Sequence, residues 1–148
     1  MAAFLLTASL AGAALAGVAA AKPMRPALEL RAGKYSIEAE CVETPELRMQ
    51  GLMSRQTLPS NRGMLFIFPA AHRQCMWMHN MHLPLSVAFI ADDGTIVNIA
   101  EMQPDTDSRY CADRPVHYAL EMNAGWFAKR GIVPGARIRG IEKAPLGL

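Results

Sequence analysis

The sequence lacks the short motifs by which many enzymes are recognised. It contains no Gly-x-Ser-x-Gly elbow, phosphate-binding loop, dinucleotide fingerprint or His-Glu-x-x-His pair. Its 15 lysines and arginines are dispersed along the chain, and the net charge is only +2. Because nucleic-acid binding needs basic residues gathered in a stripe or patch, no nucleic-acid partner is predicted. The motifs therefore predict no cofactor and assign no catalytic residue.

Cysteine is also scarce. The three cysteines Cys41, Cys75 and Cys111 show no C-x-x-C spacing, which argues against a zinc ribbon or a thioredoxin-type site. Cys75 opens an expected strand, and Cys111 lies in a polar loop, residues 104–115, with little apolar anchoring of its own. In an oxidising compartment we expect a Cys75–Cys111 disulfide that ties this loop to the sheet, with Cys41 left as an inert thiol. In a reducing cytosol all three thiols would stay unpaired.

Charge is absent from residues 1–21, which are mainly apolar and end in Ala19-Ala20-Ala21. Small residues at these positions suit a signal peptidase, so residues 1–21 are expected to be a signal peptide whose removal leaves Lys22 first. No lysine or arginine precedes the apolar run, which is a departure from the usual pattern. An uncleaved membrane anchor and a cytosolic protein therefore stay as alternatives. We expect a periplasmic or secreted protein without stable membrane insertion after cleavage.

The rest of the chain has the length and composition of one soluble domain. Residues 22–34 are expected to form a linker, broken by two prolines and a glycine, with an edge strand over residues 27–31. Residues 35–143 are expected to form a single β-rich domain, and residues 144–148 a C-terminal tail.

Strand patterns recur along this domain. Residues 35–42 and 116–123 alternate apolar and polar side chains with period two, and residues 85–91 form an apolar run whose two faces must both be covered. Asp92-Asp93-Gly94 is typical of a hairpin turn. The expected strands comprise residues 35–42, 64–68, 74–80, 85–91, 96–99, 116–123 and 137–141.

Two short helices complete the prediction. Thr44 is a suitable N-cap for a helix that begins at Pro45 and runs to about residue 55, and Asn123 can cap a two-turn helix over residues 124–130. Short, evenly spaced strands separated by turns predict a mainly β fold. We expect a small sandwich or jelly-roll-like barrel with these two short helices attached.

Several short motifs occur in one order along the chain and resemble the domain-of-unknown-function family 192 (DUF-192). They are Gln50-Gly51-Leu52-Met53, Gly63-Met64-Leu65-Phe66-Ile67-Phe68, Trp77-Met78 with Asn80, Pro84-Leu85, Phe89-Ile90 with Asp93-Gly94, and Leu120-Glu121 with Asn123-Ala124-Gly125. The resemblance covers about residues 35–141. The resemblance implies a mainly β domain of sandwich or jelly-roll type that is often exported, and it implies no particular function.

The chain departs from the family pattern at three positions. Histidine stands at position 79 where the family usually has lysine, methionine at 81 in place of threonine, and serine at 86 where aspartate is frequent. If a polar site is built around His79, Met81 and Ser86, this chain has altered it.

Four residues of these motifs are candidates for a ligand site. Trp77, Asn80, Glu121 and Asn123 could line a polar cleft for a small polar molecule or sugar, with the indole stacking on the ligand. The alternating pattern places His117, Glu121 and Asn123 on the outward side of their strand, so an ordinary solvent-exposed polar face is the alternative. A periplasmic small-ligand-binding or accessory module is the leading interpretation.

A small hydrolase or lyase is a second interpretation, with Glu121 as general base assisted by His117 or His79. A third is a copper-binding protein, because residues 75–82 are rich in thioether and imidazole donors that suit Cu(I). In an extended strand these donors alternate between two faces, and no face collects three good donors unless the chain turns at Asn80. Core methionines beside surface histidines explain the segment more simply, so no metal is assigned.

The leader prediction is tested by the mass of the exported protein. Cleavage after Ala21 should give a chain that begins at Lys22 and is two mass units lighter than the fully reduced form, because one disulfide has formed. Intact-mass spectrometry before and after reduction and alkylation measures both quantities. A chain that retains Met1 with every thiol alkylated without prior reduction would contradict the prediction.

Overall fold

A curled seven-stranded sheet forms the body of the protein, with strand order β6-β5-β8-β3-β2-β1-β9. The computed structural model describes residues 27–148, so the predicted signal peptide and residues 22–26 lie outside the described residues. A second sheet pairs β4 with β7. The strands are β1 Ala27–Ala32, β2 Tyr35–Val42, β3 Arg62–His72, β4 Cys75–Trp77, β5 Leu85–Ile90, β6 Ile96–Met102, β7 Arg109–Cys111, β8 Val116–Asn123 and β9 Ile138–Arg139.

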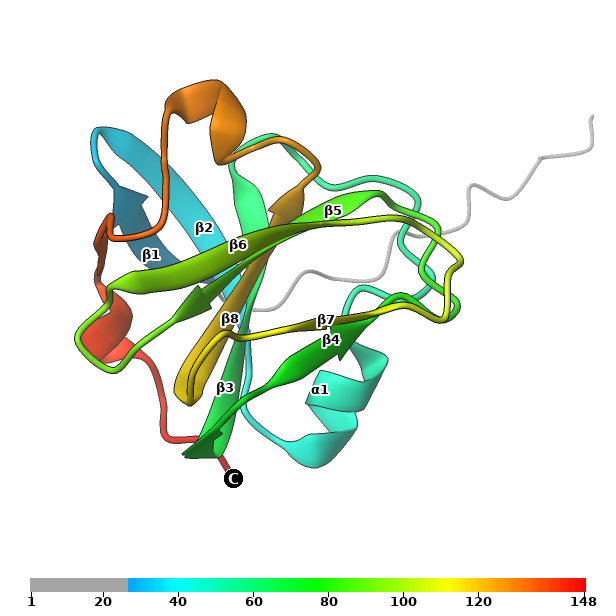
Figure 1. Ribbon diagram of the computed structural model, residues 1–148, viewed down its shortest axis with the longest axis horizontal. Coiled ribbons are helices and arrows are strands. Elements are labelled where there is room, and N and C mark those ends of the chain that lie inside the picture. The colour runs from blue at the N-terminus through cyan, green and yellow to red at the C-terminus, as the bar shows by residue number, and fades with distance from the viewer. Residues whose placement is uncertain (1–26) are drawn as a thin grey trace, which may run out of the picture.

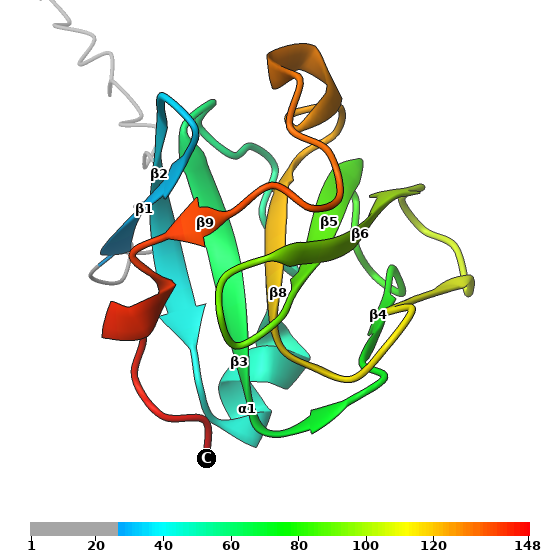
Figure 2. The same ribbon diagram turned by 60° about the vertical axis from the view of Figure 1, so that its left-hand side comes forward.

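The sheet is curled, so that the segment before β6 at one end lies against the segment before β9 at the other. All neighbouring strands are antiparallel except β2 and β3, whose connection carries the helix α1 (Pro45–Gln50). Thr95 beside β6 pairs with Arg137 beside β9, and the Ile138 amide donates to the Gly94 carbonyl at 2.8 Å. These bonds bring β9 back against the start of β6 (Figure 2). The mainly β, barrel-like prediction is confirmed, with the sheet rolled into a half-barrel.

Two clusters of buried side chains pack on opposite faces of the sheet. Inside the curl, β1, β2, β5 and β8 surround a cluster that also takes in Trp126 and Phe127. On the other face, α1, the following turn and β4 cover the central strands (Figure 1). The second cluster comprises Val42, Leu52, Leu58, Met64, Phe66, Met76, Met78, Met81, Leu85, Val87, Phe89, Met102, Ala112, Val116 and Ala119. The central strands are therefore covered on both sides, as the apolar run over β5 predicts.

Both helices are shorter than the sequence predicts. Thr44 caps α1 by accepting the Leu47 amide proton, but Gly51, with a φ of 45°, ends the helix at Gln50 instead of residue 55. In the second case Gly125 has a φ of 73°, so the expected two-turn helix is reduced to one 3₁₀ turn, Ala128–Arg130. A further 3₁₀ turn, Ile141–Lys143, follows β9. Glycine in these conformations interrupts the regular helix.

Strand boundaries also differ in several places: β3 and β6 are longer than predicted, and β7 lies within the loop expected over residues 104–115. The strand expected over residues 27–31 is present as β1, but it is not an edge strand, because it lies between β2 and β9 in the main sheet. The strand expected over residues 74–80 ends at Trp77, because the chain turns through Asn80, whose φ is 57°. Asparagine adopts this left-handed conformation more readily than most residues.

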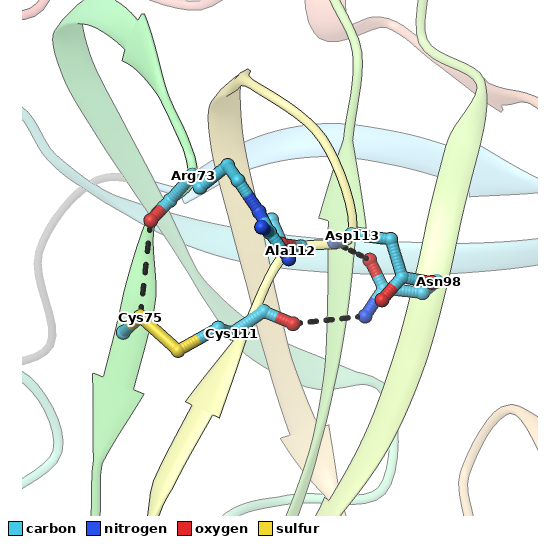
Figure 3. Close-up of a disulfide and its surroundings, with 6 residues drawn as sticks. All are labelled: Arg73, Cys75, Asn98, Cys111, Ala112 and Asp113. Atoms are coloured by element: carbon cyan, nitrogen blue, oxygen red, sulfur yellow. Dashed lines mark hydrogen bonds between the residues drawn. A yellow bond between two sulfur atoms is a disulfide. The ribbon is translucent and has the colours of Figure 1, made fainter.

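The Cys75–Cys111 disulfide is confirmed and joins β4 directly to β7 (Figure 3). We call the two strands β4 and β7 the ribbon. Asn98 of β6 holds the ribbon against the main sheet: its side-chain nitrogen donates to the Cys111 carbonyl at 3.1 Å, and its side-chain oxygen accepts from the Asp113 backbone amide at 3.0 Å (Figure 3). Cys41 is the free cysteine of the described residues. The disulfide thus joins the two strands of this ribbon to each other, and Asn98 holds the ribbon against the main sheet.

Replacing both bridge cysteines, Cys75→Ser with Cys111→Ser, should lower the free energy of unfolding by about 4 kcal/mol, because the bridge closes a loop of 36 residues. Urea denaturation of the two proteins measures the difference. Cys41→Ser is the matched control and should lower stability much less. An unchanged midpoint in the double variant would show that the ribbon needs no covalent fastening.

Candidate functional site

A cavity of about 330 Å³ lies between α1 with its following turn on one side and the β4 strand with its following turn on the other. The walls are mainly apolar, and sulfur atoms are frequent in them. The lining residues are Arg48, Met49, Gln50, Gly51, Leu52, Met53, Phe66, Phe68, Cys75, Met76, Trp77, His79, Asn80, Met81 and Glu121. Three of the four predicted site residues, Trp77, Asn80 and Glu121, therefore meet at one cavity.

Glu121 supplies a carboxyl group to this cavity from the middle of β8. Its side chain is only 3% exposed, and its partners on the neighbouring strands are Met64 of β3 and Val87 of β5. Within residues 27–148, its Oε2 atom has no hydrogen-bond partner. A buried polar atom without a partner costs stability, which makes Glu121 a candidate for a functional group.

Burial in these apolar surroundings raises the pKa of Glu121 to about 8. A carboxyl group is harder to ionise where water cannot solvate its charge. At neutral pH Glu121 is therefore mainly protonated and can donate a hydrogen bond as well as accept one.

The outward orientation expected for Glu121 is correct, but the expected exposure of that face is wrong. Period-two alternation places Ala119 and Glu121 on one side of β8, and the structure covers this side with the second core cluster. The covering elements, α1 and β4, are distant from β8 in sequence, so the local pattern does not report them.

Trp77 and Asn80 belong to the ribbon side of the cavity. The Trp77 side chain is 54% exposed, and its ring stacks on the His79 imidazole with centroids 4.7 Å apart. The His79 Nδ1 atom lies 3.2 Å from a carboxylate oxygen of Asp107. An exposed indole at the edge of an apolar cavity is available for contact with a ligand.

Asn123 has a different environment. Its amide nitrogen donates to the carbonyl of Leu58 at 2.8 Å and to that of Pro59 at 3.4 Å. Asn123 is not among the residues that line the cavity. It holds the loop before β3 against the end of β8.

The histidines considered as catalytic partners are separated by the fold. His117 contacts Asp92 at the β5–β6 hairpin and does not line the cavity. His79 does line it, together with Glu121. His82 contacts Asp105. Of the two predicted assistants for Glu121, only His79 is thus at the same cavity.

Sequence reasoning missed the contribution of the α1 side. Met49 and Met53 line the same cavity as Met76 and Met81, and the Arg48 guanidinium, which also lines it, donates to the carbonyls of Glu43 and Ile67. Met53 lies in a motif shared with the family, which is the one signal that could have directed attention to this segment. Within residues 27–148, no three histidine, cysteine or acidic side chains lie close enough to hold a metal ion.

The remaining departure from the family pattern, Ser86, lies away from the cavity. Its buried hydroxyl donates to the Glu101 carboxylate at 2.7 Å and accepts from the Gly125 amide at 2.8 Å. Ser86 and Glu101 thus fix the turn that follows β8.

Comparison with known proteins gives a family and two solved structures. The profile of the DUF192 family, described as an uncharacterized ACR, matches residues 27–140. A crystal structure from Sinorhizobium meliloti, described as a candidate transcription regulator, is 36% identical with a TM-score of 0.71 and covers 76% of this chain and 91% of its own. A protein of unknown function from Novosphingobium aromaticivorans is 28% identical with a TM-score of 0.74, covering 87% of this chain and 99% of its own. No curated protein matches.

Glu121→Gln should change how stability depends on pH. Unfolding exposes Glu121 and returns its pKa from about 8 to its ordinary value of 4.5. The protonated carboxyl favours the folded state, so wild-type stability is full below pH 4.5 and falls as the pH rises to 8. The neutral glutamine lacks this loss, so the variant should exceed wild type by a few kcal/mol at pH 8, since a tenfold change in proton affinity corresponds to about 1.4 kcal/mol.

Urea denaturation between pH 4 and pH 9 measures this difference. Glu40→Gln is the control, because Glu40 is equally buried but is paired with Arg55 at 2.6 Å. That variant should lose stability through the broken ion pair. Parallel stability curves for wild type and Glu121→Gln would contradict the assignment of a buried, neutral Glu121.

Proposed function

Because the chain belongs to the DUF192 family, for which no activity is established, we propose its function from the cavity: it is an exported protein that binds a small organic ligand. The observation that carries the proposal is the buried Glu121 carboxyl, whose Oε2 atom lacks a partner in the wall of an apolar cavity. A ligand that hydrogen-bonds to this atom would remove the cost of leaving it unpaired.

The cavity wall indicates the chemistry of the ligand. Phenylalanine, leucine and methionine side chains make up most of it, so an apolar or ring-shaped body is favoured. Glu121 and Asn80 supply polar contacts for one head group, and Trp77 supplies a stacking surface. A sugar presents many hydroxyl groups to such a wall, and we expect it to bind more weakly than a ligand with a single polar head.

Export is supported by two features of the chain. Residues 1–21 are mainly apolar and end in three alanines, which match the apolar core and the cleavage site of a leader. The Cys75–Cys111 bridge is of the kind that persists in oxidising compartments. Among residues 27–148, no helix has the length and apolar character needed to cross a membrane.

The raised pKa of Glu121 favours hydrogen bonding to a ligand over base catalysis at neutral pH. A general base must be deprotonated at the working pH, and the pKa of about 8 keeps Glu121 largely protonated at neutral pH. His79 shares the cavity, so a hydrolase or lyase with these two residues stays a second candidate at alkaline pH. His117 of β8 contacts Asp92 in the β5–β6 hairpin, away from the cavity, and is not part of the proposed hydrolase or lyase site.

Ligand binding is tested with a thermal-shift screen followed by titration. Compounds with an apolar body and one amide, ketone or hydroxyl head should raise the melting temperature, whereas sugars should have little effect. The fluorescence of the exposed Trp77 reports binding, while Trp126 is buried in the other core cluster. A screen without any stabilising compound would count against the proposal.

Glu121→Leu should lower the affinity of a screened ligand by at least about tenfold, since an unpaired polar group costs 1–3 kcal/mol. Leucine fills the buried position without a hydrogen-bonding group, so the variant should stay folded. His117→Ala is the control because His117 lies on the same strand but away from the cavity. Equal affinity in wild type and Glu121→Leu would remove Glu121 from the ligand site.

A further inference from the structure

We propose that the methionine-rich wall of this cavity is a Cu(I) site. The donors are the thioethers of Met49, Met53, Met76 and Met81 and the imidazole of His79, all of which line the same cavity. Thioether and imidazole groups are soft or borderline donors that suit Cu(I), whereas calcium and magnesium require oxygen.

The turn at Asn80 brings the ribbon donors together. In a continuous strand Met76 would lie on the opposite face from His79 and Met81. The chain instead leaves the strand after Trp77 and turns at Asn80, where φ is 57° and the Met81 amide donates to the Met78 carbonyl at 3.1 Å. The alternation that separates soft donors in the sequence is therefore broken in the fold.

His79 is held in the manner of a metal ligand. Its Nδ1 atom lies 3.2 Å from the Asp107 carboxylate, which leaves Nε2 as the nitrogen available for coordination. Histidines that bind metals usually have such an outer carboxylate or carbonyl partner on the other ring nitrogen. Trp77 stacks on the His79 ring with centroids 4.7 Å apart and so helps to fix the orientation of the imidazole.

On the α1 side of the cavity the donors are Met49 and Met53, of which Met49 is accessible from solvent. Met49 is 76% exposed, which is unusual for an apolar side chain, and its thioether can meet a metal ion from solvent. Cys75 lines the cavity as well, but its sulfur is in the disulfide and is not a thiolate ligand. The cavity as a whole is thus lined by four thioethers and no free thiol.

This assignment goes beyond the organic ligand proposed above and uses other atoms of the same cavity. It requires thioethers and an imidazole, whereas the organic ligand requires the Glu121 carboxyl and the Asn80 amide. Each can therefore fail without the other.

The test is a titration of the disulfide-bonded protein with Cu(I) under argon, in competition with a chromophoric Cu(I) chelator. We expect one Cu(I) ion per chain by native mass spectrometry, with sulfur and nitrogen neighbours in the X-ray absorption spectrum. A protein that leaves the metal with the weakest chelator of the series overturns the proposal. A spectrum with only oxygen and nitrogen neighbours does the same.

Two double variants, Met49→Leu/Met53→Leu and Met76→Leu/Met81→Leu, remove thioethers while conserving volume. Each should weaken Cu(I) binding by at least about tenfold, because even outer-shell partners of a metal contribute that much. Met102→Leu is the matched control, since Met102 is buried in the same core cluster but does not line the cavity. Equal affinities in wild type and both double variants overturn the proposal.

The free thiol of Cys41 is the competing site for Cu(I). Cys41 packs against the cluster inside the curl, and burial raises the pKa of its thiol, followed by a smaller effect of Glu43. Cys41→Ser should retain the metal, and loss of Cu(I) in this variant overturns the assignment. If the protein binds an organic compound but takes up no Cu(I), the organic-ligand proposal is supported and this one is overturned. If it takes up Cu(I) but binds no screened compound, the Cu(I) site is supported and the organic-ligand proposal fails.

Discussion

The covering of both faces of the central strands is the constraint on which the rest of the protein depends. One face closes through the curl of the sheet, where the start of β6 bonds to the segment before β9. The other face is covered by α1 and the disulfide-linked ribbon. These two covering elements do not pack perfectly against each other, and the cavity lies between them.

This constraint also determines the chemistry of Glu121. A glutamate on an exposed strand would be an ordinary surface residue, but the covering elements remove water from it and leave its carboxyl in apolar surroundings. The disulfide joins the two strands of the ribbon to each other, and Asn98 of β6 holds the ribbon against the main sheet. Both the carboxyl and the thioethers acquire functional interest from the same exclusion of water.

Local sequence signals predict much of the fold. Period-two alternation identifies β2 and β8, the apolar run identifies β5, and Thr44-Pro45 identifies the start of α1, because each of these patterns reflects a short-range preference. The pairing of Cys75 with Cys111 is also predicted, from the need to anchor a polar loop. The positions of helix ends are not, because Gly51 and Gly125 adopt left-handed conformations that single-residue preferences do not specify.

The candidate site is predicted only in part, for a related reason. Trp77, Asn80 and Glu121 come from the family motifs, but the burial of Glu121 arises from α1, about seventy positions earlier in the chain. The turn at Asn80 is permitted by asparagine without being required by it. Met49 gives no signal in the sequence, since a methionine in a helix is usually part of a core, and Met53 is marked only by the family motif.

The ribbon of β4 and β7 is a separate sheet of three-residue strands, and the residues of its following turn contribute little to the interior of the curl. Substitutions at the exposed position 79 can therefore alter what the cavity accepts while the half-barrel keeps its stability. The half-barrel sheet and the turn after β4 are thus separate parts of the structure. Related proteins can differ in the ligand that they select through changes in this turn, without compensating changes in the sheet.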